Sequence, residues 1–278
     1  MKKYLTAIPD IENHDFVSCI DELPLWSAPF GLSLLDKIEM KAGMKVLDIG
    51  CGLGFPLIEI AQRLGNTCRV SGIDPWETAL DRIRLKLKQN DISNVDVFNA
   101  KAESMPFETA GFNLIVSNNG LNNVQDLDQA IRECGRVAAQ GAQLVITQNL
   151  EGTMKEFYAL FERVLAEKQL FAEMNVLKEH IYHKRRPLGE VLEILNKSGF
   201  QHIRTEEHCF YLRVLDAEAF FNHTLIKYWF CDSWKEIIKP EMMEEIFSEL
   251  ESGLNHMAAE KGEIRLPVPY VTVECRKR

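Results

Sequence analysis

The strongest constraint on the fold is a glycine-rich turn that directly follows a short apolar run. The run is MKVLDIG, and Gly50, Gly52 and Gly54 continue from it with GxGxG spacing before a helical pattern at 56–64. Glycine lets the backbone turn tightly and approach a ligand closely, so this order of strand, turn and helix predicts a parallel α/β sheet with a ligand at the turn. A dinucleotide fingerprint needs its third glycine where this chain has Phe55, which argues against that ligand.

Two carboxylates near the turn constrain the charge of the ligand. Asp48 precedes the glycines, and Asp74 ends the second strand-like run, CRVSGID. A carboxylate beside a pyrophosphate is unfavourable, whereas beside an ammonium or sulfonium group it is favourable. An acidic residue at the end of the second strand can also accept both ribose hydroxyls. The pair predicts a positively charged nucleoside, and Trp76, which follows Pro75, is expected either to cover one adenine face or to pack on the sheet.

Strand-like and helical patterns alternate over the first 150 residues, which is typical of repeated βαβ units. Further strands are predicted at VDVFNA, FNLIVSN and AQLVITQ, with helices at 76–89 and 126–138. After Gln148 the predicted elements are one amphipathic helix at 153–171, a helix at 188–197, a strand at 201–209, and long helices at 217–238 and 240–259. The alternation in VPYVTVEC predicts a closing strand.

Composition excludes several classes of partner. The net charge is -9 and there is no basic stripe, which argues against nucleic-acid binding. No run approaches the roughly 18 apolar residues of a membrane helix, and the first ten residues lack the apolar segment of a signal peptide, so we expect a soluble, cytoplasmic protein without a membrane partner. The seven cysteines form no CxxC pair and no zinc-type spacing, which predicts free thiols and no metal site.

Five segments in order resemble the class I S-adenosylmethionine-dependent methyltransferases. They are VLDIGCGLGF, VSGIDP, AESMPF, FNLIVSNNGLNNVQD and IRECGRVAAQGAQLVIT, which together cover roughly 44–147, with a weaker echo in VLEILNKSGFQHIRTEE. The resemblance implies a Rossmann-like α/β fold, a seven-stranded mostly parallel sheet with helices on both faces. It also implies S-adenosylmethionine as cofactor and S-adenosylhomocysteine as product.

The resemblance also implies a set of cofactor-binding residues. These are Asp48, Gly50, Cys51, Gly52, Gly54, Asp74, Pro75, Trp76, Ala102, Glu103 and Asn118. Gly50 and Gly52 are expected at the methionine moiety, with Asp48 near its amino group. Asp74 is expected at the ribose. Ala102 and Glu103 are expected at the adenine edge, and Asn118 beside the amino acid end. One departure is Lys101, which stands where an acidic residue commonly accepts the adenine amino group, so Glu103 or a backbone carbonyl is expected to serve instead.

The remaining segments are predicted to cover the cofactor site. The expected organisation is an N-terminal helical lid segment at 1–43, the cofactor-binding core at 44–150, a helical insertion at 151–186, a core continuation at 187–211, a helical lid insertion at 212–266 and a closing antiparallel strand at 267–278. In the family's fold these insertions leave from the cofactor face. They therefore predict an enclosed pocket for a small or medium organic acceptor.

Candidates for acceptor binding come from the lid segments, namely Trp26, Tyr182, Arg186, His223 and Trp229. The alternative for each is a structural role: lid core for the aromatic and histidine side chains, and a solvated turn for the arginine. No catalytic residue is assigned, because methyl transfer depends mainly on alignment and needs a general base only for a protonated acceptor. Two alternative functions are a catalytically inactive cofactor-binding regulator, suggested by Lys101 and the AAQGA turn, and non-methyl chemistry with the same cofactor.

Overall fold

The strands of the protein form one seven-stranded sheet within the described residues. The computed structural model describes residues 2–22 and 25–278. The predicted lid segment at 1–43 therefore includes three residues that lie outside the described part. The strands are β1 (Lys45–Ile49), β2 (Arg69–Asp74), β3 (Val95–Asn99), β4 (Phe112–Asn118), β5 (Ala138–Asn149), β6 (Phe200–Val214) and β7 (Ile264–Lys277).

The sheet has the order β3-β2-β1-β4-β5-β7-β6. Strands β1 to β5 pair in parallel, and β7 runs antiparallel to β5, with Thr147 opposite Thr272. The predicted Rossmann-like sheet and its antiparallel last strand are confirmed. Strand order reverses at β1 and β4, so the loops after these two strands flank the crevice in which such sheets bind ligands.

The chain divides into two compact units. The first, which we call the sheet unit, comprises Ile11–Asn149, Arg186–His208 and Tyr270–Arg278. The second, the helical unit, comprises the residues up to Asp10 together with Leu150–Arg185 and Cys209–Pro269. The division falls inside β6 and β7. Whether the helical unit acts as a lid stays a prediction.

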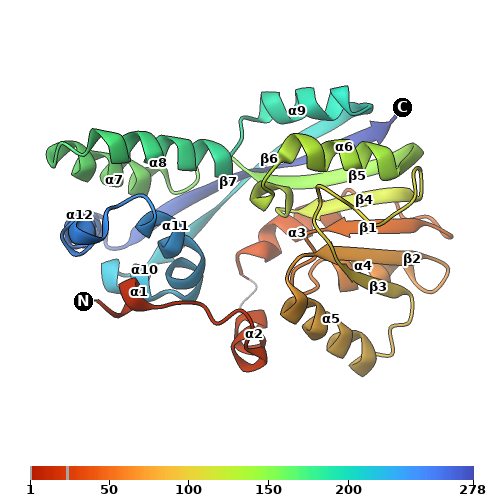
Figure 1. Ribbon diagram of the computed structural model, residues 1–278, viewed down its shortest axis with the longest axis horizontal. Helices are drawn as coiled ribbons and strands as arrows, with labels where there is room; N and C mark the ends of the chain where they lie inside the picture. The colour runs from red at the N-terminus through yellow and green to blue at the C-terminus, as the bar shows by residue number, and fades with distance from the viewer. Residues whose placement is uncertain (1, 23–24) are drawn as a thin grey trace. The chain divides into compact units, whose positions relative to one another are not determined.

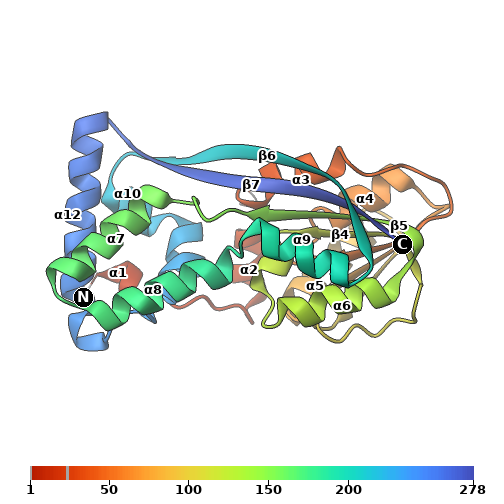
Figure 2. The same ribbon diagram turned by 90° about the horizontal axis from the view of Figure 1, so that it is seen from above.

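Helices cover both faces of the sheet unit. They are α2 (His14–Asp21), α3 (Ser27–Leu35), α4 (Leu57–Leu64), α5 (Glu77–Gln89), α6 (Leu127–Val137) and α9 (Leu188–Lys197). Figures 1 and 2 show α3 and α4 on one face and α6 and α9 on the other. Strand β1 is buried on both faces, since Val46 and Leu47 are 0% exposed. The near-continuous apolar run of this strand follows from that double cover.

The helical unit is built around aromatic side chains. Its helices are α1 (Lys3–Thr6), α7 (Lys155–Glu167), α8 (Phe171–Lys184), α10 (Ala217–Asn222), α11 (Cys231–Lys235) and α12 (Met243–Lys261). The rings of Phe157 and Trp234 lie 4.3 Å apart, and Tyr4 stacks on Phe221 at 4.7 Å. Helix α7 packs against both α8 and α12 (Figure 1). The unit therefore has an apolar core of its own.

Two long helices expected from the sequence are broken in the structure. The pattern at 153–171 is divided between α7 and α8, because Gln169 adopts a left-handed φ of 57°. The pattern at 217–238 is interrupted at His223, whose ψ of 129° is extended, and continues as a π-helical turn (Ile226–Phe230) before α11. Asn222, His223 and Thr224 have low helix propensity, which favours a break at this point. None of the helices in the described ranges combines the length and apolar character needed to cross a bilayer.

Candidate cofactor and active site

The glycine turn after β1 adopts backbone conformations that side chains disfavour. Gly50 has a φ of 73° and Gly52 a φ of 49°. A Cβ atom at Gly50 would lie 2.9 Å from the Cα of Gly120, so the turns after β1 and β4 approach each other closely. A Cβ at Gly52 would meet no atom within 4 Å. The backbone is therefore closely packed against the neighbouring turn at Gly50, whereas there is open space beside Gly52.

Asp74 holds this turn in place from the end of β2. Its Oδ2 accepts the Gly52 N–H at 2.9 Å, and its Oδ1 accepts the Trp76 N–H at 3.0 Å. Burial raises the pKa of Asp74, and the two N–H groups counteract part of that rise. A carboxylate offers about four lone-pair sites, so two remain after these bonds for further donors such as ribose hydroxyls. The sequence predicted that Asp74 contacts the ribose, but not that it holds the glycine turn in place.

Asp48 is a buried carboxyl group without a partner. Its side chain is 0% exposed, and neither carboxyl oxygen has a hydrogen-bond partner among the described residues. Burial, and secondly the charge of Asp74, raises the pKa of Asp48 to about 8. The Leu57 N–H at the start of α4 offsets a little of this rise without forming a hydrogen bond of normal geometry. A cationic group placed here would complete the site.

Two neighbours of the turn are less available to a ligand than predicted. The Trp76 indole donates from Nε1 to the Ile11 carbonyl oxygen at 2.8 Å, so its position is fixed by the N-terminal segment, and Pro75 beside it is exposed. Cys51 is buried, and burial raises the pKa of its thiol well above the usual range. Cys51 therefore stays a neutral thiol.

The predicted adenine edge is partly used for helix capping. Ala102 is 7% exposed. The Oε1 of Glu103 accepts the N–H groups of Gln125 at 2.8 Å and of Asp126 at 3.2 Å, just before α6. These bonds give Glu103 a structural role as well. Lys101 is exposed.

Asn118 belongs to a cluster of amide side chains at the carboxyl ends of β4 and β5. Its Oδ1 accepts the Thr147 hydroxyl at 3.1 Å, and its Nδ2 donates to the Ser27 carbonyl at 3.2 Å. Beside it, Asn122 Nδ2 donates to Asn149 Oδ1 at 2.8 Å. Sequence reasoning missed Asn122 and Asn149, although the asparagine-dense SNNGLNN segment after the fourth strand was a usable signal.

A histidine on β6 was also missed. The Nε2 atom of His208 is buried and has no hydrogen-bond partner among residues 2–22 and 25–278, and its ring stacks on Tyr270 at 4.9 Å. Tyr270 in turn donates its hydroxyl to the Pro29 carbonyl at 2.9 Å. His208 gave no sequence signal, because it lies in a strand with alternating polar and apolar residues.

The predicted acceptor residues fall into different units. Trp26 and Arg186 belong to the sheet unit, whereas Tyr182, His223 and Trp229 belong to the helical unit. Arg186 donates from Nε to Glu190 at 2.7 Å. His223 has a buried Nδ1 without a partner, and burial lowers the pKa of its ring. Tyr182 and Trp229 are 39% and 38% exposed, so neither is lid core.

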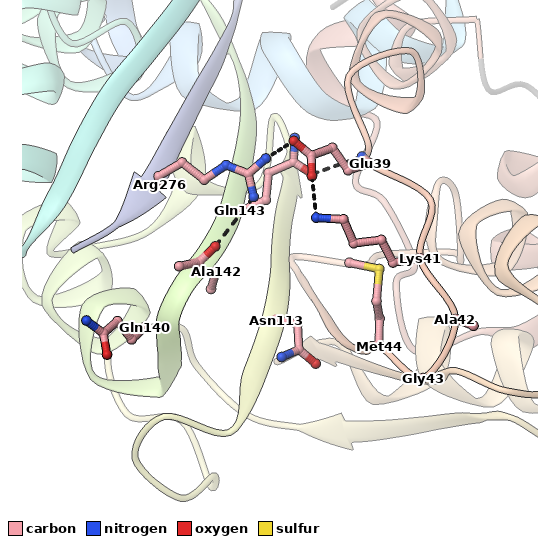
Figure 3. A pocket seen from close by; sticks show the side chains of 11 residues that line it. Glu39, Lys41, Ala42, Gly43, Met44, Asn113, Gln140, Ala142, Gln143 and Arg276 are labelled. Atoms are coloured by element: carbon pink, nitrogen blue, oxygen red, sulfur yellow. Dashed lines mark hydrogen bonds and ion pairs between the residues drawn. The ribbon is translucent and has the colours of Figure 1, made fainter.

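A pocket of about 280 Å³ lies at the other end of the strands from the glycine turn, where β1 and β4 begin. Figure 3 shows Arg276, Lys41 and Gln143 directed toward Glu39. The Glu39 carboxylate pairs with Arg276 and with Lys41 Nζ at 2.7 Å, and the Glu39 N–H donates to Gln143 at 3.0 Å. These polar groups of the pocket are paired with one another, and the pocket is far along the strands from the glycine turn. It is therefore separate from the candidate site.

Comparison with known proteins agrees with this geometry. Residues 40–209 match a family model described as a methyltransferase domain. A demethylmenaquinone methyltransferase of Listeria monocytogenes is 28% identical over 179 residues, 62% of this chain and 76% of that protein. The corresponding protein of Lactococcus lactis is 24% identical over 212 residues, which cover 73% of this chain and 79% of that one.

Two solved structures share the fold. The YcgJ protein of Bacillus subtilis has a TM-score of 0.57 at 16% identity, covering 90% of this chain and 97% of that one. The geranyl diphosphate C-methyltransferase of Streptomyces coelicolor, solved with S-adenosylhomocysteine, has a TM-score of 0.56 at 14% identity, covering 90% and 76%. The chain belongs to the class I S-adenosylmethionine-dependent methyltransferases. It is an enzyme of that class.

The residues present fit this cofactor. Asp48 offers two unpartnered buried oxygens for an ammonium group, and Gly52 leaves open space beside the turn. Asp74 keeps acceptor capacity next to the same turn. The charge arrangement suits a cation and disfavours a diphosphate, as the sequence predicted.

Proposed function

We propose that this methyltransferase acts on a small or medium organic acceptor, and that residues of the helical unit bind that acceptor. The observation that carries the proposal is the place of this unit in the chain. One helical segment begins directly after Asn149, the last residue of β5, and another lies between β6 and β7. Ligands of open α/β sheets bind beyond the carboxyl ends of the strands, so such insertions supply specificity.

The chain's own residues have a limited chemical task in this proposal. S-adenosylmethionine, when bound, supplies a methyl group on a sulfonium leaving group. Asp48 would hold the amino group of the cofactor, Asp74 its ribose, and Asn118 would lie beside its amino acid end. The protein then aligns the acceptor and excludes water, which accounts for most of the catalysis in such a transfer. His208 and His223 are the candidates for a base if the acceptor needs one.

The relatives suggest where to begin the search for the acceptor. Because proteins 28% identical to this chain are named demethylmenaquinone methyltransferase, demethylmenaquinone belongs in the first assay panel. The chain's seven unpaired cysteines fit a reducing compartment, which supports our proposal of a cytoplasmic location.

The test is transfer of a labelled methyl group from S-adenosylmethionine into a panel of small molecules. The expected result is label in an organic-soluble or small polar product, and much less product with Asp74→Ala. Titration with S-adenosylhomocysteine measures cofactor binding separately. Label that enters only protein or nucleic acid would contradict the small-acceptor proposal, and a product whose mass lacks the added methyl group would point to non-methyl chemistry.

A further inference from the structure

The helical unit contains a buried arginine whose charge no other side chain neutralises. Arg185 follows the last residue of α8 and is 3% exposed. Its Nη2 donates to the Tyr158 hydroxyl oxygen at 3.2 Å, whereas its Nε and Nη1 have no hydrogen-bond partner. No carboxylate among residues 2–22 and 25–278 forms an ion pair with it. Buried arginines are normally paired, so this one requires an explanation.

Hydrogen-bond donors outnumber acceptors around Arg185. The Tyr158 oxygen accepts from Arg185 and also from Trp234 Nε1, at 3.1 Å. With these two bonds its lone pairs are occupied, and its own O–H proton has no acceptor in the described part of the chain. The Tyr158 ring lies 4.8 Å from the Arg185 Cζ, which keeps the guanidinium in position. Nε, Nη1 and the Tyr158 hydroxyl thus form a set of donors that lacks an acceptor.

The side chains whose pKa values respond to Arg185 are basic groups rather than carboxylates. Burial, and secondly the charge of Arg185, lowers the pKa of His180 to about 4 and also lowers the pKa of Lys184. The His180 ring lies 6.3 Å from the Tyr158 ring. Among the described residues, no carboxylate is recorded in an ion pair or hydrogen bond with Arg185, so its buried guanidinium keeps an unneutralised charge and donors without acceptors.

We propose that Arg185 and Tyr158 form a binding site for the oxyanion group of a small molecule, a carboxylate or a phosphate monoester. Nη2 carries a second N–H beside the one that it donates to Tyr158, so the edge formed by Nη1 and Nη2 can bind two oxygens of such a group, and the tyrosine hydroxyl supplies a further donor. Binding would neutralise the buried charge and satisfy the donors together. Resting on the proposed function, we assign the oxyanion to the methyl acceptor, which makes that acceptor acidic.

The first test measures thermal unfolding of the full chain with inorganic phosphate or benzoate, each against sodium chloride at equal ionic strength. We expect one of the two anions to raise the Tm by about 3 °C or more near a tenfold excess over its Kd. The anion with the larger effect identifies the acceptor as a phosphate ester or a carboxylate. No saturable shift with either anion up to 50 mM, a concentration on the order of the weakest specific binding, would overturn the proposal.

Three variants test whether the anion-induced rise in Tm depends on Arg185 and Tyr158. In Arg185→Met the anion shift should disappear, and in Tyr158→Phe, which keeps the ring, it should fall several-fold. Arg213→Met is the matched control, because Arg213 is an exposed arginine of the same unit that pairs with Glu263 at 2.7 Å, and it should keep the full shift. An anion shift that survives in both Arg185→Met and Tyr158→Phe would overturn the site.

Cofactor binding separates this proposal from the proposed function. Arg185→Met should bind S-adenosylhomocysteine within about twofold of the wild type, since the cofactor residues lie in the sheet unit. If the wild type does not bind S-adenosylhomocysteine, the proposed function is contradicted. The result of the anion titration would still decide whether Arg185 and Tyr158 bind an oxyanion. If the anion site is present but the methylated product is neutral, the assignment of the oxyanion to the acceptor is wrong.

Discussion

Asp48 should couple cofactor binding to proton release. Its carboxyl group is fully buried and unpartnered, and its pKa is raised to about 8, so it is mainly protonated in the free protein at pH 7. An ammonium group of the ligand would favour the ionised form. Binding of S-adenosylhomocysteine should therefore release close to one proton. Asp48→Asn, which cannot ionise, should release none.

The size of the change in cofactor affinity with pH follows from the raised pKa of Asp48. Each pH unit below the pKa of Asp48 costs about 1.4 kcal/mol to remove its proton, so cofactor affinity should fall by tens of fold between roughly pH 7.5 and 5.5. This window lies below the α-amino pKa of about 7.7–8.0, so the ligand stays cationic throughout. The charge of Asp74 adds to the raised pKa of Asp48, and Asp74 is present in both the wild type and Asp48→Asn.

The assay is calorimetric titration with S-adenosylhomocysteine at pH 6.5 in two buffers of different ionisation enthalpy. The difference in observed enthalpy gives the number of protons released. Equal enthalpies in the two buffers, together with an affinity that does not change with pH, would refute the reasoning, since Asp48 would then be either ionised in the free protein or distant from the amino group. Asp48→Asn, which retains Asp74 and should show a much weaker pH dependence than the wild type, is the matched control.

The raised pKa of Asp48 also determines whether the free energy of unfolding increases or decreases with pH. The unfolded chain ionises Asp48 near its usual value of 3.8, whereas the folded chain holds the proton up to about 8. Stability of the ligand-free protein therefore decreases as pH rises across this window, by at most about 6 kcal/mol from this group. Thermal unfolding of wild type and Asp48→Asn across the window should show a smaller loss of Tm in the variant.

Three further predictions test the site and the core. Asp74→Ala should weaken S-adenosylhomocysteine binding by about 1–3 kcal/mol in calorimetry, because the turn loses its acceptor as well as the ribose contact; unchanged affinity would contradict both roles. Glu103→Ala should cost about 0.5–2 kcal/mol in chemical unfolding by uncapping the segment before α6, with little loss of cofactor affinity. Trp234→Ala, at a fully buried position, should cost about 3–5 kcal/mol in unfolding, and a loss below 1 kcal/mol would argue against the aromatic core.

Much of the sheet unit could be predicted from the sequence. The apolar run before Gly50 is continuous because β1 is buried on both faces, and the helix at 188–197 was predicted with the bounds that α9 has. The positive φ of Gly50 and Gly52 explains why these positions are glycine. In these segments local pattern, turn chemistry and tertiary packing agree, which is the situation in which sequence reasoning works best.

The helical unit was less predictable because its form depends on long-range contacts. The break at His223 leaves a π-helical turn before α11 and places Trp234 against Phe157, and no local periodicity specifies that contact. The capping role of Glu103 likewise depends on Gln125, 22 residues further along the chain. Arg185 was part of a polar HKRR segment, which in sequence reads as solvated, and only its burial separates it from Arg186.

Within the described residues, each unit contains a buried charge-bearing group with unsatisfied hydrogen-bonding atoms that we assign to a ligand, Asp48 in the sheet unit and Arg185 in the helical unit. A buried group of this kind destabilises the fold, and replacement by an apolar or neutral residue is often tolerated. If both groups serve ligands, Asp48→Asn and Arg185→Met should be at least as stable as the wild type without ligand, and each should lose one ligand only. If either group is structural, its neutral variant should instead unfold more easily, because the surrounding donors or acceptors would lose a partner. The comparison of ligand-free stability with ligand-induced stabilisation thus separates the two roles at each position.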